Sequence, residues 1–252
     1  MRKFFVENEN VNLEEDKILI VGQDVNHIRN VLRLSLSEKI LLCDKLNSKN
    51  YISEIEKIEN ESVSCKIVEE VEGESEGNVE LHIYQGLPKA DKMELIIQKA
   101  VELGAYEIIP VATKRAVVKL DDKKAKKKIE RWQQIAESAA KQSKRTLIPE
   151  IAMPMSWKEA LKKAENLDVV LVPYENERGM EATREVLKSI KPGQSIGVFV
   201  GPEGGFAPEE IEQIAPHTEE GKAHRISLGR RILRTETAGL ATLSMLIFCL
   251  DE

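Results

Sequence analysis

A glycine-rich turn follows an apolar segment in the second half of the sequence. The run GPEGGF at residues 201–206 comes directly after residues 196–200, and a helix is expected to begin near Pro208. Three glycines and a proline within five residues let the backbone approach a ligand closely. Open α/β sheets bind ligands beyond the carboxyl ends of their strands, where this turn is expected. The spacing matches neither GxGxxG nor a Walker loop, so a nucleotide-like ligand and a purely structural turn both stay open.

A second group of polar residues begins about 25 residues further along the chain. The segment ISLGRRILRTETA spans residues 226–238 and contains Gly229. Its three arginines are Arg230, Arg231 and Arg234. Thr235 and Glu236 then open the expected final helix, where hydroxyl and carboxylate groups can cap free amides. The alternative is that Glu236 is an acid favoured by the helix dipole and that the arginines are surface charges. Because each of the two loops follows an expected strand, the pair favours a shared pocket.

The elements that must position these loops alternate between strands and helices. Strands are expected at residues 80–85, 106–111, 169–173, 195–200 and 223–226. Helical spacing of apolar residues predicts helices at residues 89–103, from 121 to about 139, and at 156–164, 180–189, 208–214 and 235–250. Such an alternation is typical of a mostly parallel sheet with helices on both faces. We therefore expect an α/β domain over residues 79–252.

The first 72 residues have a different pattern. Short strands are expected at residues 3–6, 18–21, 39–43, 51–58 and 62–71. Between the second and third lies an expected helix, residues 24–34, with Asp24 as N-cap. Its polar stripe comprises Asn26, Arg29, Asn30 and Arg33, which would face either RNA or water. These elements predict a small β-barrel over residues 1–72, and the polar run GESEGN at 73–78 predicts a linker.

Charge is unevenly distributed along the chain. The net charge of the whole chain is −6, and a net negative charge argues against a nucleic-acid partner. This average conceals the local distribution of charge. Residues 82–150 hold 15 basic and nine acidic residues, whereas residues 1–72 hold 10 basic and 15 acidic ones. Within the basic block, the lysine run includes Lys124, Lys127 and Lys128 and continues to Lys141, Lys144 and Arg145. The run is either a solvated helix face or a surface that binds RNA phosphates by releasing counterions.

Several classes of protein are excluded by what the sequence lacks. No segment is apolar over the roughly 20 residues needed to span a bilayer, and the start MRKFFVENEN has no apolar core typical of a signal peptide. The three cysteines and four histidines have no spacing typical of disulfide or zinc sites. The expectation is a soluble, cytoplasmic protein without a metal.

Six segments together resemble the bacterial 16S ribosomal RNA uridine-N3-methyltransferases, the ribosomal RNA small subunit methyltransferase E family of the SPOUT superfamily. They are MRKFF at the start, DVNHIRNVLRL at 24–34, QGLPKADKMELIIQKAVELG at 85–104, RWQQIAESAAKQSKR at 131–145, GPEGGF at 201–206 and LGRRILRTETA at 228–238. The resemblance implies a PUA-like RNA-binding β-barrel and an α/β domain with a trefoil knot. It also implies a homodimer that acts on 16S rRNA or the 30S subunit.

The resemblance implies S-adenosyl-L-methionine as methyl donor, bound by three loops. The implied cofactor residues are Leu171, Val172, Gly201, Pro202, Glu203, Gly204, Gly205, Ile226, Leu228, Gly229, Ile232 and Leu233. Uridine N3 carries a proton, so its methylation needs a base or a cation that stabilises the uracil anion. Carboxylate candidates are Glu203, Glu236 and Glu175, and the cation candidate is Arg234. Alternatives are a ribose 2′-O-methyltransferase, a non-catalytic RNA-binding ribosome-assembly factor, and an enzyme acting on a small nucleotide.

Overall fold

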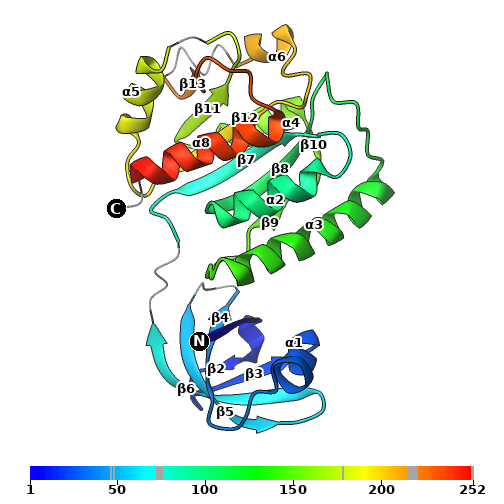
Figure 1. The fold of residues 1–252 in the computed structure, drawn as a ribbon, viewed down its shortest axis with the longest axis vertical. Helices are drawn as coiled ribbons and strands as arrows, with labels where there is room; N and C mark the ends of the chain where they lie inside the picture. Colours follow the sequence, from blue (N-terminus) through cyan, green and yellow to red (C-terminus); the bar gives the residue numbers. More distant parts are fainter. Residues whose placement is uncertain (46, 48, 72–75, 178, 215–220, 251–252) are drawn as a thin grey trace. The chain divides into compact units, whose positions relative to one another are not determined.

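The computed structural model describes residues 1–45, 47, 49–71, 76–177, 179–214 and 221–250. It divides the chain into two units (Figure 1). Unit 1 comprises Met1–Glu76 and Lys141–Leu147, and unit 2 comprises Gly77–Ala140 and Ile148–Glu252. Residues 141–147 thus pack with the N-terminal unit, although the sequence-based range 79–252 places them in the second domain. Half of the expected linker, residues 73–75 of 73–78, lies outside the described residues.

Unit 1 is built on a six-stranded sheet with the order β1-β4-β5-β6-β3-β2. Its strands are β1 (Arg2–Val6), β2 (Val11–Asn12), β3 (Lys17–Val21), β4 (Lys39–Asp44), β5 (Asn50–Ile58) and β6 (Ser62–Val71). β1 pairs in parallel with β4, and the other pairs are antiparallel. Register shifts at Ile52/Ser53 and Ile55/Lys57 mark irregularities between β5 and β6, and such bulges bend a sheet. The five expected strands are confirmed, and they enclose a core that includes Ile18, Leu42 and Tyr51.

The helix of unit 1 differs from the expected one. Besides the short 3₁₀ turn η1 (Asn8–Asn10), unit 1 contains α1 (Gln23–Asn26), which runs on as the π-helix η2 (His27–Leu32). Asp24 as N-cap is wrong, because Gly22 precedes the helix and the Asp24 carboxylate lies 3.2 Å from Lys141 Nζ. Arg33, with φ of +52°, ends the helix. The wider π turn is a feature that often accompanies functional sites.

One carboxylate ties residues 141–147 into unit 1. Glu76 Oε2 accepts a hydrogen bond from the Arg145 guanidinium at 2.5 Å, and Oε1 accepts from the backbone N–H groups of Thr146 at 2.7 Å and Leu147 at 3.1 Å. Arg145 is only 3% exposed. A buried guanidinium is stable only with such a partner. Arg145 is therefore a structural residue, not part of a basic surface.

Unit 2 is built on a seven-stranded parallel sheet with the order β10-β8-β7-β12-β11-β13, and β9 pairs with β8. The strands are β7 (Glu80–Gly86), β8 (Ala105–Ala112), β9 (Glu150–Ile151), β10 (Met155–Ser156), β11 (Val169–Pro173), β12 (Ser195–Val200) and β13 (Ala223–Ile226). The helices are α2 (Lys92–Glu102), α3 (Asp122–Gln142), α4 (Trp157–Ala164), α5 (Glu181–Ser189), α6 (Pro208–Glu212) and α8 (Thr235–Leu250). The predicted alternation is confirmed, whereas the trefoil knot stays a prediction.

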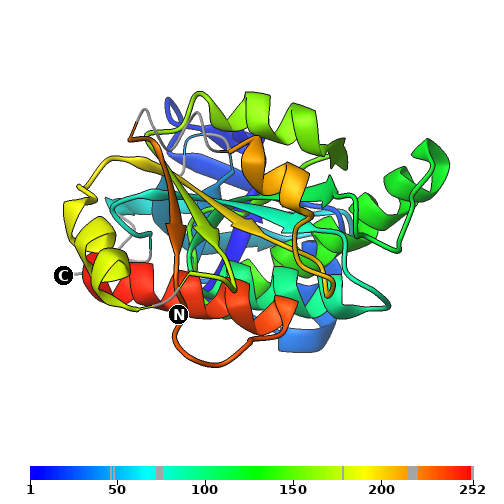
Figure 2. The same cartoon turned by 90° about the horizontal axis from the view of Figure 1, so that it is seen from above.

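Helices cover both faces of the parallel sheet, as Figure 2 shows. On one face α4 and α6 bury an aromatic cluster in which Tyr84 and Phe199 stack at 4.2 Å between ring centroids and Trp157 meets Phe199 edge-on. On the other face α2 and α8 pack against each other and α8 contacts β7 and β12. This second layer carries the start of α8 to the carboxyl end of β12. No described helix is long and apolar enough to cross a membrane.

A buried charge cluster lies near the first residues of β8, at the end of the strand away from its carboxyl end. Glu107 accepts from His82 Nδ1 at 3.0 Å and pairs with Lys163 Nζ at 2.5 Å. Burial alone would raise the pKa of Glu107, but the contacts with His82 and Lys163 outweigh burial and hold the pKa below its ordinary value. The lowered pKa means that the carboxylate stabilises the folded state above about pH 4.3 and that this contribution is lost as the pH falls through the folded-state value.

Glu107→Gln is expected to lower the free energy of unfolding by about 1–2 kcal/mol at pH 7, because a half-exposed Lys163 then loses its partner. Urea unfolding at pH 7 and pH 3.5 measures the effect. The difference between variant and natural chain should shrink at the lower pH. A difference that is the same at both pH values would contradict the stabilising role of the charge.

Candidate active site

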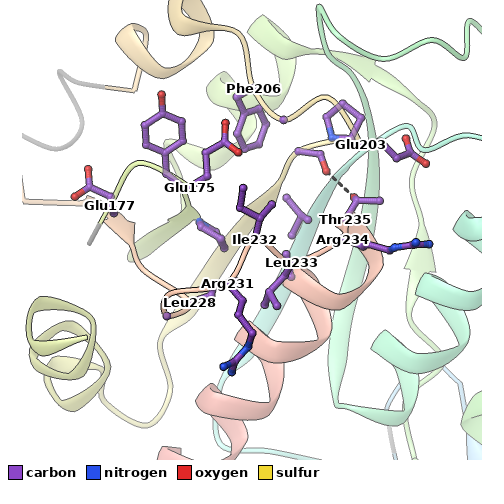
Figure 3. A pocket seen from close by; sticks show the side chains of 18 of the residues that line it. Glu175, Glu177, Glu203, Phe206, Leu228, Arg231, Ile232, Leu233, Arg234 and Thr235 are labelled. Atoms are coloured by element: carbon purple, nitrogen blue, oxygen red, sulfur yellow. Dashed lines mark hydrogen bonds between the residues drawn. The ribbon is translucent and has the colours of Figure 1, made fainter. Parts of the chain in front are cut away.

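A cavity of about 420 Å³ lies where β11, β12 and β13 end at the carboxyl edge of the sheet (Figure 3). Its walls come from the last residues of β11 and β12, from the three loops that follow these strands, from the first turn of α8 (Thr235–Leu250) and from the first residue of α2. The lining residues are Lys92, Pro173, Tyr174, Glu175, Glu177, Val200, Gly201, Pro202, Glu203, Gly205, Phe206, Leu228, Gly229, Arg230, Arg231, Ile232, Leu233, Arg234, Thr235 and Ala238. The size is that of a pocket for a nucleoside-like molecule.

The glycine-rich turn needs small residues on two different elements. Gly205 adopts a φ of +65°, and its N–H donates to Pro202 O at 2.9 Å, which closes the turn. At the end of β7, a Cβ on Gly86 would lie 2.6 Å from Pro202 Cδ and 2.8 Å from Pro202 N. Such a contact is too close for any side chain, so the turn rests directly on the Gly86 backbone. Arg115 also holds the turn by donating to Gly204 O at 2.9 Å.

The start of α8 is joined to the same turn by a buried hydroxyl. Thr235 Oγ1 donates to Gly201 O at 2.6 Å and accepts from Gln85 Nε2 at 2.9 Å (Figure 3). Gln85 is fully buried, and its Nε2 also donates to Gly86 O at 2.9 Å. Hydrogen bonds of buried groups are costly to break. The three segments that carry the candidate residues are therefore held in one geometry.

Two carboxylates of the site share one ammonium group. Lys92 Nζ lies 3.1 Å from Glu203 Oε1 and 3.2 Å from Glu236 Oε2. The contacts with Glu203 and Glu236 raise the pKa of Lys92. Partial burial would raise the pKa of Glu203, but hydrogen bonds to its carboxylate, including those from Lys92 and from the backbone N–H of Lys89, outweigh burial and lower it. Lys92 and Glu203 are therefore both charged at neutral pH.

The structure brings most of the predicted site residues to this cavity. Its lining includes Arg234, Glu175 and eight of the residues predicted to bind the cofactor: Gly201, Pro202, Glu203, Gly205, Leu228, Gly229, Ile232 and Leu233. Leu171, Val172 and Ile226 are buried inside β11 and β13 and do not line it, and neither does Gly204. Glu236 does not line the cavity but contacts Lys92, which does, and its side chain is 17% exposed.

Several lining residues were missed by sequence reasoning. Lys92 lies in the segment QGLPKADKMELIIQKAVELG and is the first residue of α2, where a cation opposes the helix dipole. That unfavourable position was the available sign of a role. Tyr174, directly after β11, also lines the cavity, and a single tyrosine forms no pattern of its own in the sequence.

Charged residues lie on two sides of the cavity. Figure 3 shows Glu175 and Glu177 on one side and Glu203 with Arg234 on the other, while Arg231 points away from Glu203. Glu177 is neutralised by Arg225, whose Nε lies 3.0 Å from its Oε1. Among the described residues, no group of three or more His, Cys, Asp or Glu side chains could hold a metal ion.

The residues predicted to contact RNA are exposed in their own units. In unit 1, Arg29 donates to Asn60 Oδ1 at 2.7 Å, Asn30 donates to Asn26 Oδ1 at 2.6 Å, and Arg33 is exposed. In unit 2, Lys124 and Lys127 are exposed on α3 and Lys128 is half-buried. Lys124 Nζ pairs with Asp121 at 3.1 Å. The expected basic run does not extend to Lys141, which pairs with Asp24, or to the buried Arg145.

Comparisons with known proteins identify the family. Residues 75–247 match the RNA methyltransferase domain family, and residues 20–68 match the RNA methyltransferase PUA domain family. The chain is 38% identical to ribosomal RNA small subunit methyltransferase E of Bacillus subtilis over 98% of this chain and 96% of the relative. The chain belongs to the ribosomal RNA small subunit methyltransferase E family. The resemblance drawn from the sequence motifs is thereby confirmed.

Two solved structures of similar proteins share this fold. A ribosomal RNA small subunit methyltransferase E from Neisseria gonorrhoeae, bound to S-adenosyl methionine, is 30% identical with a TM-score of 0.80 over 99% of this chain and 98% of that one. A methyltransferase from Legionella pneumophila, in complex with the bound cofactor SAM, is 28% identical with a TM-score of 0.79 over 98% of both chains. In both of these similar proteins the shared fold therefore binds S-adenosyl methionine.

Proposed function

We propose that the protein transfers a methyl group from S-adenosyl-L-methionine to N3 of a uridine in the RNA of the small ribosomal subunit. The observation that supports this most strongly is the cavity itself. Three loops from the carboxyl edge of the sheet enclose it, and the glycine-rich turn and the arginine-bearing loop meet there as the family motifs imply. A ribosomal RNA substrate further implies that the protein acts in the cytoplasm.

The residues of the cavity fit S-adenosyl-L-methionine. The glycine-rich turn offers backbone groups at close range, and Leu228, Ile232 and Leu233 offer an apolar wall. Glu175 supplies a negative charge on one side, which suits a cationic ligand. When bound, the cofactor supplies an electrophilic methyl group on a positively charged sulfur.

The protein's own residues handle the charge that uridine develops. Loss of the N3 proton leaves an anionic uracil, which a preorganised cation can stabilise. Arg234 lines the cavity beside Glu203 and is our candidate for that role (Figure 3). The Glu203–Glu236 pair is our candidate acceptor of the proton. Arg230 and Arg231 are exposed at the cavity and are assigned to RNA phosphates.

The proton-acceptor assignment is tested by replacing each carboxylate. Glu203→Gln and Glu236→Gln are expected to lower kcat by about 10²-fold or more in at least one variant, because a carboxamide does not take up a proton. Calorimetry with S-adenosyl-L-methionine serves as control and should show binding in both variants. Full turnover of both variants with bound cofactor would rule out a carboxylate base.

Each unit has its own proposed RNA-binding residues. In unit 2 they are the lysines of α3, and in unit 1 they are Arg29, Asn30 and Arg33. Replacing Lys124, Lys127 and Lys128 by glutamine should weaken RNA binding and lower the slope of log affinity against log salt by about 2. Cofactor affinity should not change. A matched control replaces Lys158, Lys188 and Lys191, three exposed lysines outside α3. Equal effects of the two triple variants would make α3 an ordinary solvated helix.

A homodimer is also proposed, with α8 in the contact. This helix is rich in apolar residues, and Phe248 near its end is 87% exposed. Ile232, at the cavity, is 84% exposed. A partner that covers these two side chains would remove their apolar surface from water, which favours association.

The decisive experiment measures methyl transfer from labelled S-adenosyl-L-methionine to 30S subunits and to naked 16S rRNA from a strain that lacks the gene. Mass spectrometry after nuclease digestion and removal of the sugar should find the methyl group on the released uracil. A methyl group lost with the sugar would establish the ribose 2′-O alternative. A chain that binds RNA but not the cofactor would be a non-catalytic assembly factor, and methylation of a free nucleotide alone would indicate a small-molecule enzyme.

A further inference from the structure

Lys92 occupies a position that its own helix does not favour. It is the first residue of α2, where the helix dipole repels a cation, and no side chain caps this end of the helix. Its side chain is 29% exposed and lines the cavity. The energetic reason for a lysine here must therefore lie in the groups that it contacts.

Those groups come from two distant segments. Glu203 belongs to the glycine-rich turn after β12 and Glu236 to the first turn of α8, and both lie within 3.2 Å of the same Nζ. Glu203 is further held by the backbone N–H of Lys89, at 3.1 and 3.3 Å from its two oxygens. Glu236 Oε2 is buried and accepts no aligned hydrogen bond from the residues that the structure describes. Without Lys92, the carboxylates would repel each other across a partly desolvated space.

We propose that Lys92 is a positioning residue for the methyl-transfer reaction, which holds Glu203 and Glu236 together as a pair with one net negative charge. The pair can then accept one proton from N3–H of uracil at its oxygens, while the N–CH₃ bond forms and the sulfur–carbon bond of the donor breaks. Lys92 itself neither gains nor loses a proton. This inference rests on the proposed function and adds a residue and a role to it.

Other charged groups face the same space and must be kept constant in any test. They are Asp91 before α2, Arg115 at the glycine-rich turn, Glu175 and Glu177 after β11, and Arg230, Arg231 and Arg234 after β13. Among these groups, Arg234 is the cation that we assign to the uracil anion. The cation that contacts both carboxylates is Lys92.

The first test follows the carboxyl groups directly. Glutamate side chains labelled with ¹³C are titrated by NMR in the cofactor-free protein, and Glu203→Gln and Glu236→Gln spectra assign the two signals. In Lys92→Met, the titration midpoint of the pair should move to higher pH by at least about one unit, because like charges at this distance disfavour double ionisation. Lys92→Arg should restore the midpoint. Unchanged midpoints in Lys92→Met would overturn the inference.

The second test measures kcat against pH with ribosomal RNA and saturating cofactor. Lys92→Met should lose about threefold or more in kcat at pH 5 and little at pH 9, because a midpoint raised by about one unit leaves less of the pair ionised only at low pH, with KM for RNA changed less than threefold. Lys99→Met is the matched control on the same helix, since Lys99 pairs with Glu102 three residues away and does not line the cavity as the described residues form it, and it should keep full activity. A loss that is equal at all pH values would show a merely structural role. A natural chain that methylates no RNA would overturn the proposed function, while the NMR titration would still decide the role of Lys92.

Discussion

Replacing Arg234 by methionine is expected to lower kcat by about 10²–10³-fold and to leave cofactor affinity within about threefold. The reason is that Arg234 lines the cavity on the same side as Glu203, where the proposed function requires a cation for the uracil anion. Removing one group that stabilises charge in the transition state typically has an effect of this size. Single-turnover assays with ribosomal RNA and calorimetry with S-adenosyl-L-methionine measure the two quantities separately.

Arg231→Met is the matched control for this variant. Arg231 lines the same cavity three positions earlier but points away from Glu203 (Figure 3). A residue that binds phosphate contributes to binding in the ground state and transition state alike, so its loss should raise KM for RNA and leave kcat nearly unchanged. If Arg231→Met lowered kcat as much as Arg234→Met does, the separate role of Arg234 would be wrong.

Gly86→Ala is expected to abolish measurable cofactor binding, which corresponds to a loss of at least about 10²-fold, and to reduce the free energy of unfolding by about 1–3 kcal/mol. The added Cβ would lie 2.6 Å from Pro202 Cδ and 3.2 Å from Gly201 C. Neither the proline ring nor the backbone can rotate away as a flexible side chain can. The glycine-rich turn must therefore move as a whole, and its contact with Thr235 moves with it.

Gly239→Ala provides a control from the neighbouring helix. A Cβ at this position in α8 would lie 3.5 Å from Val200 Cγ2, which is an ordinary contact. Alanine also favours helix over glycine, so this variant should be as stable as the natural chain or slightly more stable. Calorimetry and urea unfolding of both variants test the prediction. Normal cofactor affinity in Gly86→Ala would show that the turn does not depend on its contact with β7.

The strands and helices of both units could largely be predicted from the sequence, because hydrophobic period and turn residues are local. The strand before the glycine-rich turn, predicted at 195–200, is β12 with the same limits. The missed strands β2, β9 and β10 have two residues each, too few to show a period. The π-helix could not be predicted, because the spacing of its apolar residues also fits an α-helix.

The loops of the candidate site could be predicted, but their charge network could not. Glycines and arginines beside expected strands indicate a pocket without further information. Lys92, Glu203 and Glu236 lie on three segments that meet only in the folded chain, so their shared contact depends on topology. Arg145 is the opposite case, since it looked like one more surface cation of a basic run. Its partner Glu76 lies 69 residues earlier in the chain, so the pairing cannot be predicted from a local sequence pattern.

The bond network around Glu76 also bears on how the chain folds during its synthesis. Residues 141–147 belong to the N-terminal unit and supply the partners of this carboxylate. The strands of the N-terminal sheet are therefore synthesised, and leave the ribosome, well before the segment that completes their unit. We expect residues 1–71 to collapse early around their own core and to gain full resistance to proteases only after residue 147 has emerged. Domains that wait for a later segment fold in a fixed order. The N-terminal unit would then be completed in the middle of synthesis, after α3 but before the loops that form the cavity.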